Sequence, residues 1–209
     1  MKSTEALAVH KGNRRALGSI LVFAAWFLGA FIANGWADGP TADQQKQIKA
    51  AVDTIELNVT GNEKEGTRTV HSKCVIPRKP AEVWAVTRDT DHLSSFIGVL
   101  EESKLKGKEG DKEIIYWKGL VKVLFFKQGF WMSLKGEQAG PYQFKFDAFE
   151  GDFHIYRGGW RLEETPEGNT VLYREIEIKP KFFMPTMIMK SVERGIVQDI
   201  IKHVIETTS

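Results

Sequence analysis

Cysteine and net charge are the two features in which this sequence is poorest. Cys74 is the only cysteine among 209 residues, which excludes an internal disulfide, and we expect its thiol to be buried in a strand. The 29 Lys and Arg residues nearly balance the 27 Asp and Glu residues, so the formal charge is only +2. This balance gives no broad electrostatic reason to expect a nucleic-acid partner.

Catalytic and cofactor motifs are also lacking. The sequence has no Ser/His/Asp order, phosphate-binding glycine loop or dinucleotide-binding fingerprint, and we expect no cofactor. Two acidic stretches contain a histidine: Asp89, Asp91 and His92 in RDTDHL, and Glu150, Asp152 and His154 in EGDFH. Neighbouring turn positions rarely converge on one ion, so helix capping is the expected role of the first two aspartates. We predict no metal site, and solvation in a loop is the expected state of the second stretch.

The N-terminus has the pattern of an export signal. A basic patch, HKGNRR, precedes a continuous apolar run over residues 16–33, and small residues follow. Gly35 and Ala37 fit a small-residue cleavage site, which predicts a mature chain that starts near Asp38. The run also approaches the roughly 20 residues of a membrane-spanning helix, so an uncleaved anchor is the alternative. In both cases we expect the domain to be periplasmic, free or anchored to the inner membrane.

Most of the remaining chain is predicted to be β-strand. Residues 38–65 are a polar linker or lead-in, with a short helix over 44–52 and a strand over 55–59 as its expected elements. Residues 67–76 alternate polar and apolar side chains, as a half-buried strand does. Turns short enough for an antiparallel meander separate six further strands. These strands are expected over residues 98–107, 111–125, 127–136, 141–150, 153–164 and 169–180.

Two short helices and one long helix complete the prediction. Pro80 suits a first helical turn, so residues 81–86 and 93–96 are expected to form short helices that close one end of the sheet. After Pro185 the apolar pattern changes from the period of a strand to that of a helix. The predicted apolar stripe of this C-terminal helix consists of Ile188, Met189, Val192, Ile196, Ile200 and Val204. We therefore expect an α+β domain over residues 66–209, with a curved antiparallel sheet wrapped around the long helix.

Three stretches resemble the START-like (SRPBCC) superfamily. IPRKPAEVWAVTRDTDHLSSF resembles its strand-to-helix opening, and FFMPTMIMKSVERGIVQDIIKHV is similar to its C-terminal helix. GGWRLEETPEGNTVLYREIEIKP resembles the late hairpin of its polyketide cyclase and coenzyme Q-binding branches. The resemblance implies a helix-grip fold over about residues 66–206. It also implies an apolar ligand, such as a lipid, quinone, sterol or polyketide, held between the sheet and the long helix.

Strand alternation predicts which side chains face such a ligand. Lys118 and Lys122 should face water, which turns the residues between and beside them toward the concave face of the sheet. The same reasoning applies to the strands over 127–136 and 141–150. The apolar side chains expected to contact the ligand are Trp117, Val121, Phe130, Met132, Phe144, Phe146, Met189, Val192 and Ile196. Filling a closed core is the alternative for each of them.

Three polar side chains share the inward parity: His154, Tyr156 and Arg174. A charge that faces an apolar cavity is costly unless it is paired. We expect these side chains to orient a ligand head group that carries an anion or a carbonyl. The alternative is a bulge that changes the parity and leaves Arg174 in water, or paired with Glu175 or Glu177.

These observations favour a non-enzymatic, exported carrier of a hydrophobic ligand. Its partner would be a lipid or another apolar small molecule, with membrane association if the N-terminal segment is retained, and we expect a monomer. One alternative is a polyketide cyclase-like or aromatase-like enzyme that uses His154, Tyr156 and Arg174. The other is a protein-binding adaptor with a filled core and an exposed apolar patch.

Overall fold

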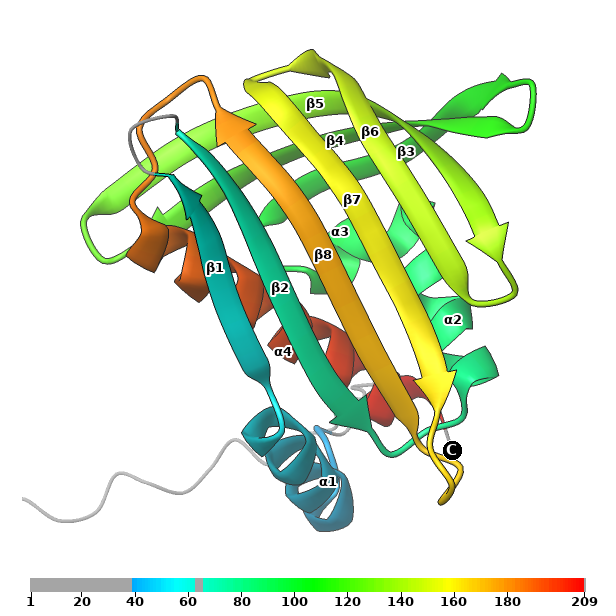
Figure 1. Cartoon of the computed structure of the whole chain (residues 1–209). Coiled ribbons are helices and arrows are strands. Elements are labelled where there is room, and N and C mark those ends of the chain that lie inside the picture. The colour runs from blue at the N-terminus through cyan, green and yellow to red at the C-terminus, as the bar shows by residue number, and fades with distance from the viewer. Residues whose placement is uncertain (1–38, 63–65, 209) are drawn as a thin grey trace, which may run out of the picture. The chain divides into compact units, whose positions relative to one another are not determined.

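An eight-stranded antiparallel sheet forms the scaffold of the domain (Figure 1). The computed structural model describes residues 39–62 and 66–208. The strand order is β1-β2-β8-β7-β6-β5-β4-β3, so the meander from β3 to β8 ends beside β2. The strands are β1 (Glu56–Asn62), β2 (Thr67–Ile76), β3 (Leu100–Glu109), β4 (Lys112–Val123), β5 (Phe126–Gly140), β6 (Gln143–Gly151), β7 (Phe153–Glu164) and β8 (Thr170–Pro180). The helices are α1 (Ala42–Asp53), α2 (Pro80–Arg88), the 3-10 helix η1 (Thr90–His92), α3 (Leu93–Phe96) and α4 (Thr186–Thr207).

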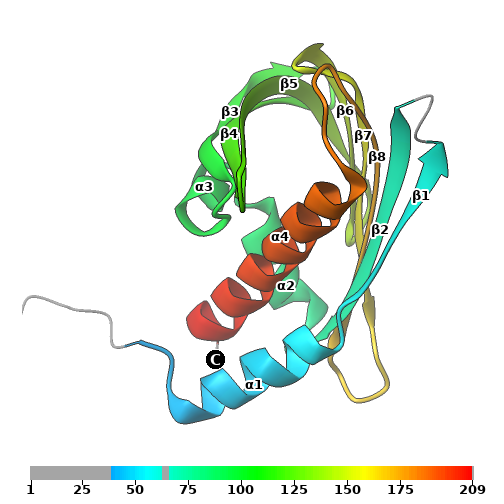
Figure 2. The same ribbon diagram turned by 90° about the vertical axis from the view of Figure 1, so that its left-hand side faces the viewer.

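The sheet curves around α4, which lies on its concave side (Figure 2). β2 illustrates why one face is buried, since every second residue of this strand is buried and the residues between them are half-buried. α4 begins directly after Pro185 and turns a row of apolar side chains toward the sheet, including Ile188, Met189 and Ile200. The α+β class and the helix-grip arrangement predicted from the sequence are therefore confirmed.

The two short helices predicted after the first long strand are present. α2 starts with Pro80, and the backbone N–H of Lys79 donates to the Glu82 side chain over 2.9 Å, which completes the start of the helix. α2 contacts α4 and β7, whereas α3 contacts β3. The ring of Trp84 is half-buried and packs edge-on against Tyr142, with the centroids 6.0 Å apart. These helices cover part of the concave face.

The helix and the strand expected within the lead-in are present as α1 and β1, and both pack against the rest of the domain. The described residues 39–62 and 66–208 belong to one compact unit. Within it, β1 pairs with β2 along its whole length, and α1 packs Ala51 into the main core. The Gln44 side chain also donates to the carbonyl of Ile205 in α4 over 3.1 Å. The polar composition concealed this role because α1 buries only a narrow side of its surface.

Arg78 joins three segments that are distant in the sequence. Its guanidinium donates to the side chain of Gln47 in α1, to the carbonyl of Ile205 in α4 and to Thr208 just after α4. These bonds fix the end of α4 against α1 and the loop after β2. The predicted export signal or anchor over residues 1–37 lies outside the described residues. Among the helices that are described, none is long and apolar enough to cross a membrane.

Candidate ligand-binding site

A cavity of about 100 Å³ lies between the concave face of the sheet and α4. Strands β4, β5, β7 and β8 contribute one wall, α4 contributes another, and the segment that follows α2 contributes Leu93, Ile97 and Val99. Most of the lining is apolar, because alternate residues of each strand point to this face. Its charged lining residues are Arg174 and Glu193.

Arg174 and Glu193 form a buried ion pair in the cavity wall. The Nε of Arg174 in β8 donates to Oε1 of Glu193 in α4 over 2.8 Å, and the side chains are only 10% and 6% exposed. The hydroxyl of Ser72 in β2 donates to the same Glu193 oxygen over 2.5 Å. Burial alone would lower the pKa of Arg174, but the Glu193 carboxylate outweighs it and holds that pKa above its ordinary value. The pair therefore carries no net charge into the cavity.

Further polar groups lie in the cavity wall. Burial raises the pKa of Tyr156 to about 12, with Arg174 acting in the opposite direction, so the phenol stays protonated at neutral pH. The indole N–H groups of Trp117 and Trp160 are buried and have no hydrogen-bond partner within the described part of the chain. Buried donors are normally satisfied, so two unpaired ones beside a cavity call for an explanation. A ligand oxygen that accepts a hydrogen bond could supply it.

Gly119 makes room for one of the aromatic walls. A side-chain Cβ at this position would lie 2.6 Å from Cζ of Phe130, its partner on β5, and 2.2 Å from the carbonyl oxygen of Val99. The absence of a side chain lets the Phe130 ring lie over β4. Phe130 in turn packs edge-on against Phe153, with the centroids 5.9 Å apart.

Nine of the twelve predicted contact residues line the cavity. They are Trp117, Val121, Phe130, Met132, Tyr156, Arg174, Met189, Val192 and Ile196. Phe144 and Phe146 face inward as expected, but they fill the core behind the cavity. The Arg88 guanidinium covers the ring of Phe144 at 3.9 Å, and Phe146 packs against Trp117 and Tyr156.

The expected inward position of His154 is wrong. Its side chain is exposed, because the pairing of β7 with β8 is irregular between Phe153 and Ile155. The irregularity shifts the parity at the start of β7 and puts Phe153, not His154, in the cavity wall. Arg174 faces the cavity as expected, and the alternative of pairing with Glu175 or Glu177 is wrong, since its partner is Glu193. Glu177 pairs with Arg157 on the outer face instead.

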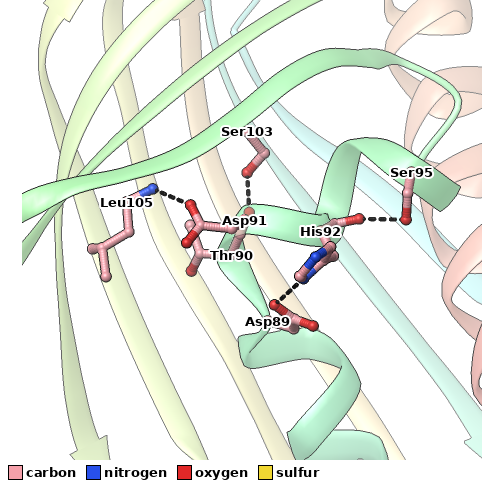
Figure 3. Close-up of polar contacts among 7 residues, drawn as sticks. All are labelled: Asp89, Thr90, Asp91, His92, Ser95, Ser103 and Leu105. Carbon is pink, nitrogen blue, oxygen red and sulfur yellow. Dashed lines mark hydrogen bonds and ion pairs between the residues drawn. The ribbon is translucent and has the colours of Figure 1, made fainter.

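The two aspartates of the acidic turn after α2 do not cap a helix as predicted, but bond to other residues (Figure 3). Asp89 Oδ1 lies 2.8 Å from Nδ1 of His92, and this hydrogen bond raises the pKa of His92. The backbone N–H of Leu105 in β3 donates to Asp91 over 2.8 Å. The two carboxylates thus serve different partners, and the described residues contain no cluster of three acidic, His or Cys side chains that could hold a metal.

The three residues of the second acidic stretch do not converge on the cavity. Asp152 accepts a hydrogen bond from the backbone N–H of Trp131 over 2.9 Å. Glu150 and His154 are exposed, and neither lines the cavity.

The wall residues that sequence reasoning missed include Glu193, Phe153, Met184 and Leu93. Among these four, only Glu193 left a usable signal. It lies four residues after Met189 and four before Val197, which places it on the buried side of the helix. The last strand has an inward arginine, and the buried side of the helix has an acidic residue. Together these positions predict that the two side chains pair.

Comparison with known proteins agrees with this architecture. Residues 76–205 match the family model described as polyketide cyclase / dehydrase and lipid transport. The chain belongs to this family. The polyketide cyclase/dehydrase and lipid transport family binds hydrophobic small molecules or lipids, which agrees with the apolar cavity. No curated protein matches the chain.

Solved structures of similar fold include proteins with different printed activities. A STAR-related lipid transfer protein from Xanthomonas axonopodis is 13% identical, with a TM-score of 0.59 over 73% of this chain and 94% of that one. A START superfamily protein from Mycobacterium smegmatis is 10% identical, with a TM-score of 0.58 over 67% and 99%. The Zhui aromatase/cyclase from Streptomyces sp. R1128 is 12% identical, with a TM-score of 0.53 over 67% and 92%. At these identities the likeness establishes the fold and leaves the activity open.

Proposed function

We propose that this protein is an exported carrier of an uncharged, lipid-like ligand. The observation that carries the proposal is the wall of the cavity, in which the charges of Arg174 and Glu193 neutralise each other and the remaining residues are mostly apolar. An apolar molecule gains about 25 cal/mol for each Å² that it buries in such a site. A ligand with a free negative charge would be buried without a counter-ion, because Arg174 is already paired.

The size of the cavity adds a condition. Sites for drug-sized ligands are usually at least about 300 Å³, whereas this cavity measures about 100 Å³. A whole lipid would therefore bind only with an outward movement of α4 or of the loop before it. The presence of a cavity also weighs against the adaptor alternative, which predicts a filled core.

A neutral fluorescent dye tests ligand binding directly. We expect Nile red to bind the unit of residues 38–209 with 1:1 saturation, and Val192→Trp to abolish binding because the indole fills the cavity. Phe149→Ser is the matched control, because it removes an exposed aromatic ring without changing the lining. Equal binding by Val192→Trp and the wild type would place the dye elsewhere and contradict the proposal.

The carrier role outside the inner membrane is supported by the N-terminal sequence. A fusion of alkaline phosphatase to the C-terminus should be active in a bacterial host, since this enzyme matures only after export. Deletion of residues 1–37 should abolish that activity. An active phosphatase in the deleted fusion would mean that the N-terminal segment does not direct export.

An enzyme that acts on polyketide-like substrates is the second candidate. It is favoured by the group formed by Tyr156, Arg174 and Glu193, which places a phenol and an ion pair in the cavity wall. The exposure of His154 removes that residue from the catalytic set of this candidate. If the protein is an enzyme, the wild type should turn over a poly-β-carbonyl mimic and Tyr156→Phe should abolish this turnover. If it is a carrier, the wild type should show no turnover.

A further inference from the structure

The turn between β4 and β5 exposes two large apolar side chains. Leu124 is 83% exposed and Phe125 is fully exposed, at 104%. Leu124 also has a φ of 52°, a left-handed conformation that this kind of hairpin turn normally gives to glycine or asparagine. Stability and solubility both disfavour leucine and phenylalanine at this tip. A function of the exposed tip would explain them.

A second pair of exposed apolar side chains lies where β8 leads into α4. Phe183, in the loop between β8 and α4, is 81% exposed, and Met187 in the first turn of α4 is 62% exposed. Figures 1 and 2 both show the β4–β5 turn and the start of α4 at the same end of the domain. We name Leu124, Phe125, Phe183 and Met187 the apolar rim.

The residues behind the apolar rim belong to one apolar cluster, which links the rim to the cavity. Val123 and Phe126 flank the tip and pack in the same cluster as Phe182 and Met184 from the loop. Met184 and Met189, on the α4 side of this cluster, also line the cavity. The rim therefore lies at the end of the cavity that the loop before α4 covers.

The charge around the apolar rim is of one sign. Residues 119–131 and 179–192 contain five lysines and no Asp or Glu. Lys122 and Lys127 are direct partners across the β4–β5 ladder, an arrangement that repels unless an anion lies nearby. Neither of them, nor Lys190 in the second turn of α4, forms an ion pair with another described residue. Exposed apolar tips within a set of lysines match the surface of a bilayer that contains anionic lipids.

We propose that the apolar rim inserts into an anionic membrane surface and that the ligand passes between bilayer and cavity at this end. Lys122, Lys127 and Lys190 contact lipid phosphates, while Phe125 and Phe183 enter the interface. A protein partner would be expected to present a defined acidic and apolar counterpart, whereas the rim is formed by two separate projecting tips, which suits a fluid surface. Docking does not require the cavity to be filled, so it can be tested apart from the proposed function.

A label at the tip tests the insertion in the full chain. Phe125→Cys can be labelled with the polarity-sensitive NBD fluorophore, because the native Cys74 is buried. The labelled chain is reconstituted with vesicles of phosphatidylcholine and phosphatidylglycerol at a 70:30 ratio. We expect a blue shift of the emission and quenching by brominated acyl chains. Phe149→Cys is the matched control on β6, where the native ring is 55% exposed, and its label should stay in water. Anchoring by the N-terminal segment would bring both labelled variants to the vesicle, whereas insertion of the rim would bury only the label at residue 125.

Charge reversal tests the role of the lysines. Lys122→Glu with Lys127→Glu should lower the fraction of buried label at least about fivefold at low salt, because each cation near an anionic surface contributes to binding. Lys108→Glu with Lys112→Glu, at the β3–β4 turn, should have little effect. A label at residue 125 that stays in water would overturn the proposal, as would equal burial of the label at residue 149. Shielding of residue 125 only after addition of periplasmic protein would instead identify a protein-binding surface and also overturn it.

Discussion

Arg174 and Glu193 join the last strand to the C-terminal helix through a hydrogen bond of 2.8 Å between Nε and Oε1. Both side chains line the cavity in which we place the ligand, and Ser72 of β2 donates to the same Glu193 oxygen. The pair therefore has two consequences, one for the stability of the domain and one for the ligands that it accepts.

Removal of one member of the pair should be strongly destabilising. Glu193→Met leaves the Arg174 charge buried without a partner, and we expect a loss of roughly 3–5 kcal/mol in the free energy of unfolding, measured by urea denaturation. Arg174→Met combined with Glu193→Met should recover most of this loss, since no buried charge remains. Arg157→Met is the control, because its pair with Glu177 is much more exposed and solvent screening should leave it a far smaller contribution to stability. Similar losses for Glu193→Met and Arg157→Met would mean that the buried pair has no special role.

The neutrality of the pair should select ligands by charge. Three naphthalene derivatives of similar shape separate the effects: 2-acetylnaphthalene has a carbonyl acceptor, 2-ethylnaphthalene has none, and 2-naphthoate is an anion. By titration calorimetry we expect the ketone to bind at least about tenfold more tightly than the carboxylate, which would be buried beside Glu193 without a free cation. The ketone should also bind more tightly than the hydrocarbon if its oxygen accepts a hydrogen bond from a buried indole N–H. Tighter binding of the carboxylate would show that Arg174 is available to an anion.

His203 should make stability depend on pH in the mildly acidic range. Its ring stacks on Phe96 with centroids 4.1 Å apart, and burial lowers its pKa below the ordinary value. The unfolded chain therefore binds a proton at a higher pH than the folded domain does, so this contribution is present above about pH 6.5 and is lost as the pH falls below it. Comparison of the urea midpoints at pH 7.5 and pH 5.5 should show a larger loss for the wild type than for His203→Phe. His92, whose pKa is raised, has the opposite dependence but is shared by both proteins. Equal losses of stability in the wild type and in His203→Phe would contradict the assignment of this pH dependence to His203.

Cys74 should be inert in the folded domain. Burial raises the pKa of its thiol to about 12, so only about one thiol in ten thousand would be ionised at pH 8. We expect no reaction with a disulfide reagent over hours, and one equivalent of reaction after unfolding in urea. Rapid modification without urea would indicate that β2 opens locally and would also compromise the selective labelling at residue 125.

The sequence predicted the scaffold well because its pattern is regular. The alternation in residues 67–76 coincides with β2, and the change of period after Pro185 coincides with α4. The inward positions of Trp117, Met132 and Arg174 followed from the same alternation. Each of these predictions needed only neighbouring residues.

The errors have a different origin, since they depend on contacts between distant segments. The register shift that exposes His154 arises where β7 begins to pair with β8, and the sequence pattern near His154 does not predict it. Alternation assigned Phe144 to the concave face but could not tell that Arg88 of α2 covers it. Glu193 was recognisable, but only if the last strand and the last helix were considered together. The folding of α1 against α4 likewise rests on long-range bonds.

The most direct test of the central claim is native mass spectrometry of residues 38–209, exported by a bacterial host and purified without detergent. We predict a stoichiometric added mass of a neutral, apolar molecule, which organic solvent removes and which Val192→Trp lacks. If the host does not make the natural ligand, added 2-acetylnaphthalene should produce the 1:1 complex in the wild type alone. A wild-type protein that carries no added mass and takes up no more probe than Val192→Trp would contradict the claim that the cavity is a ligand-binding site.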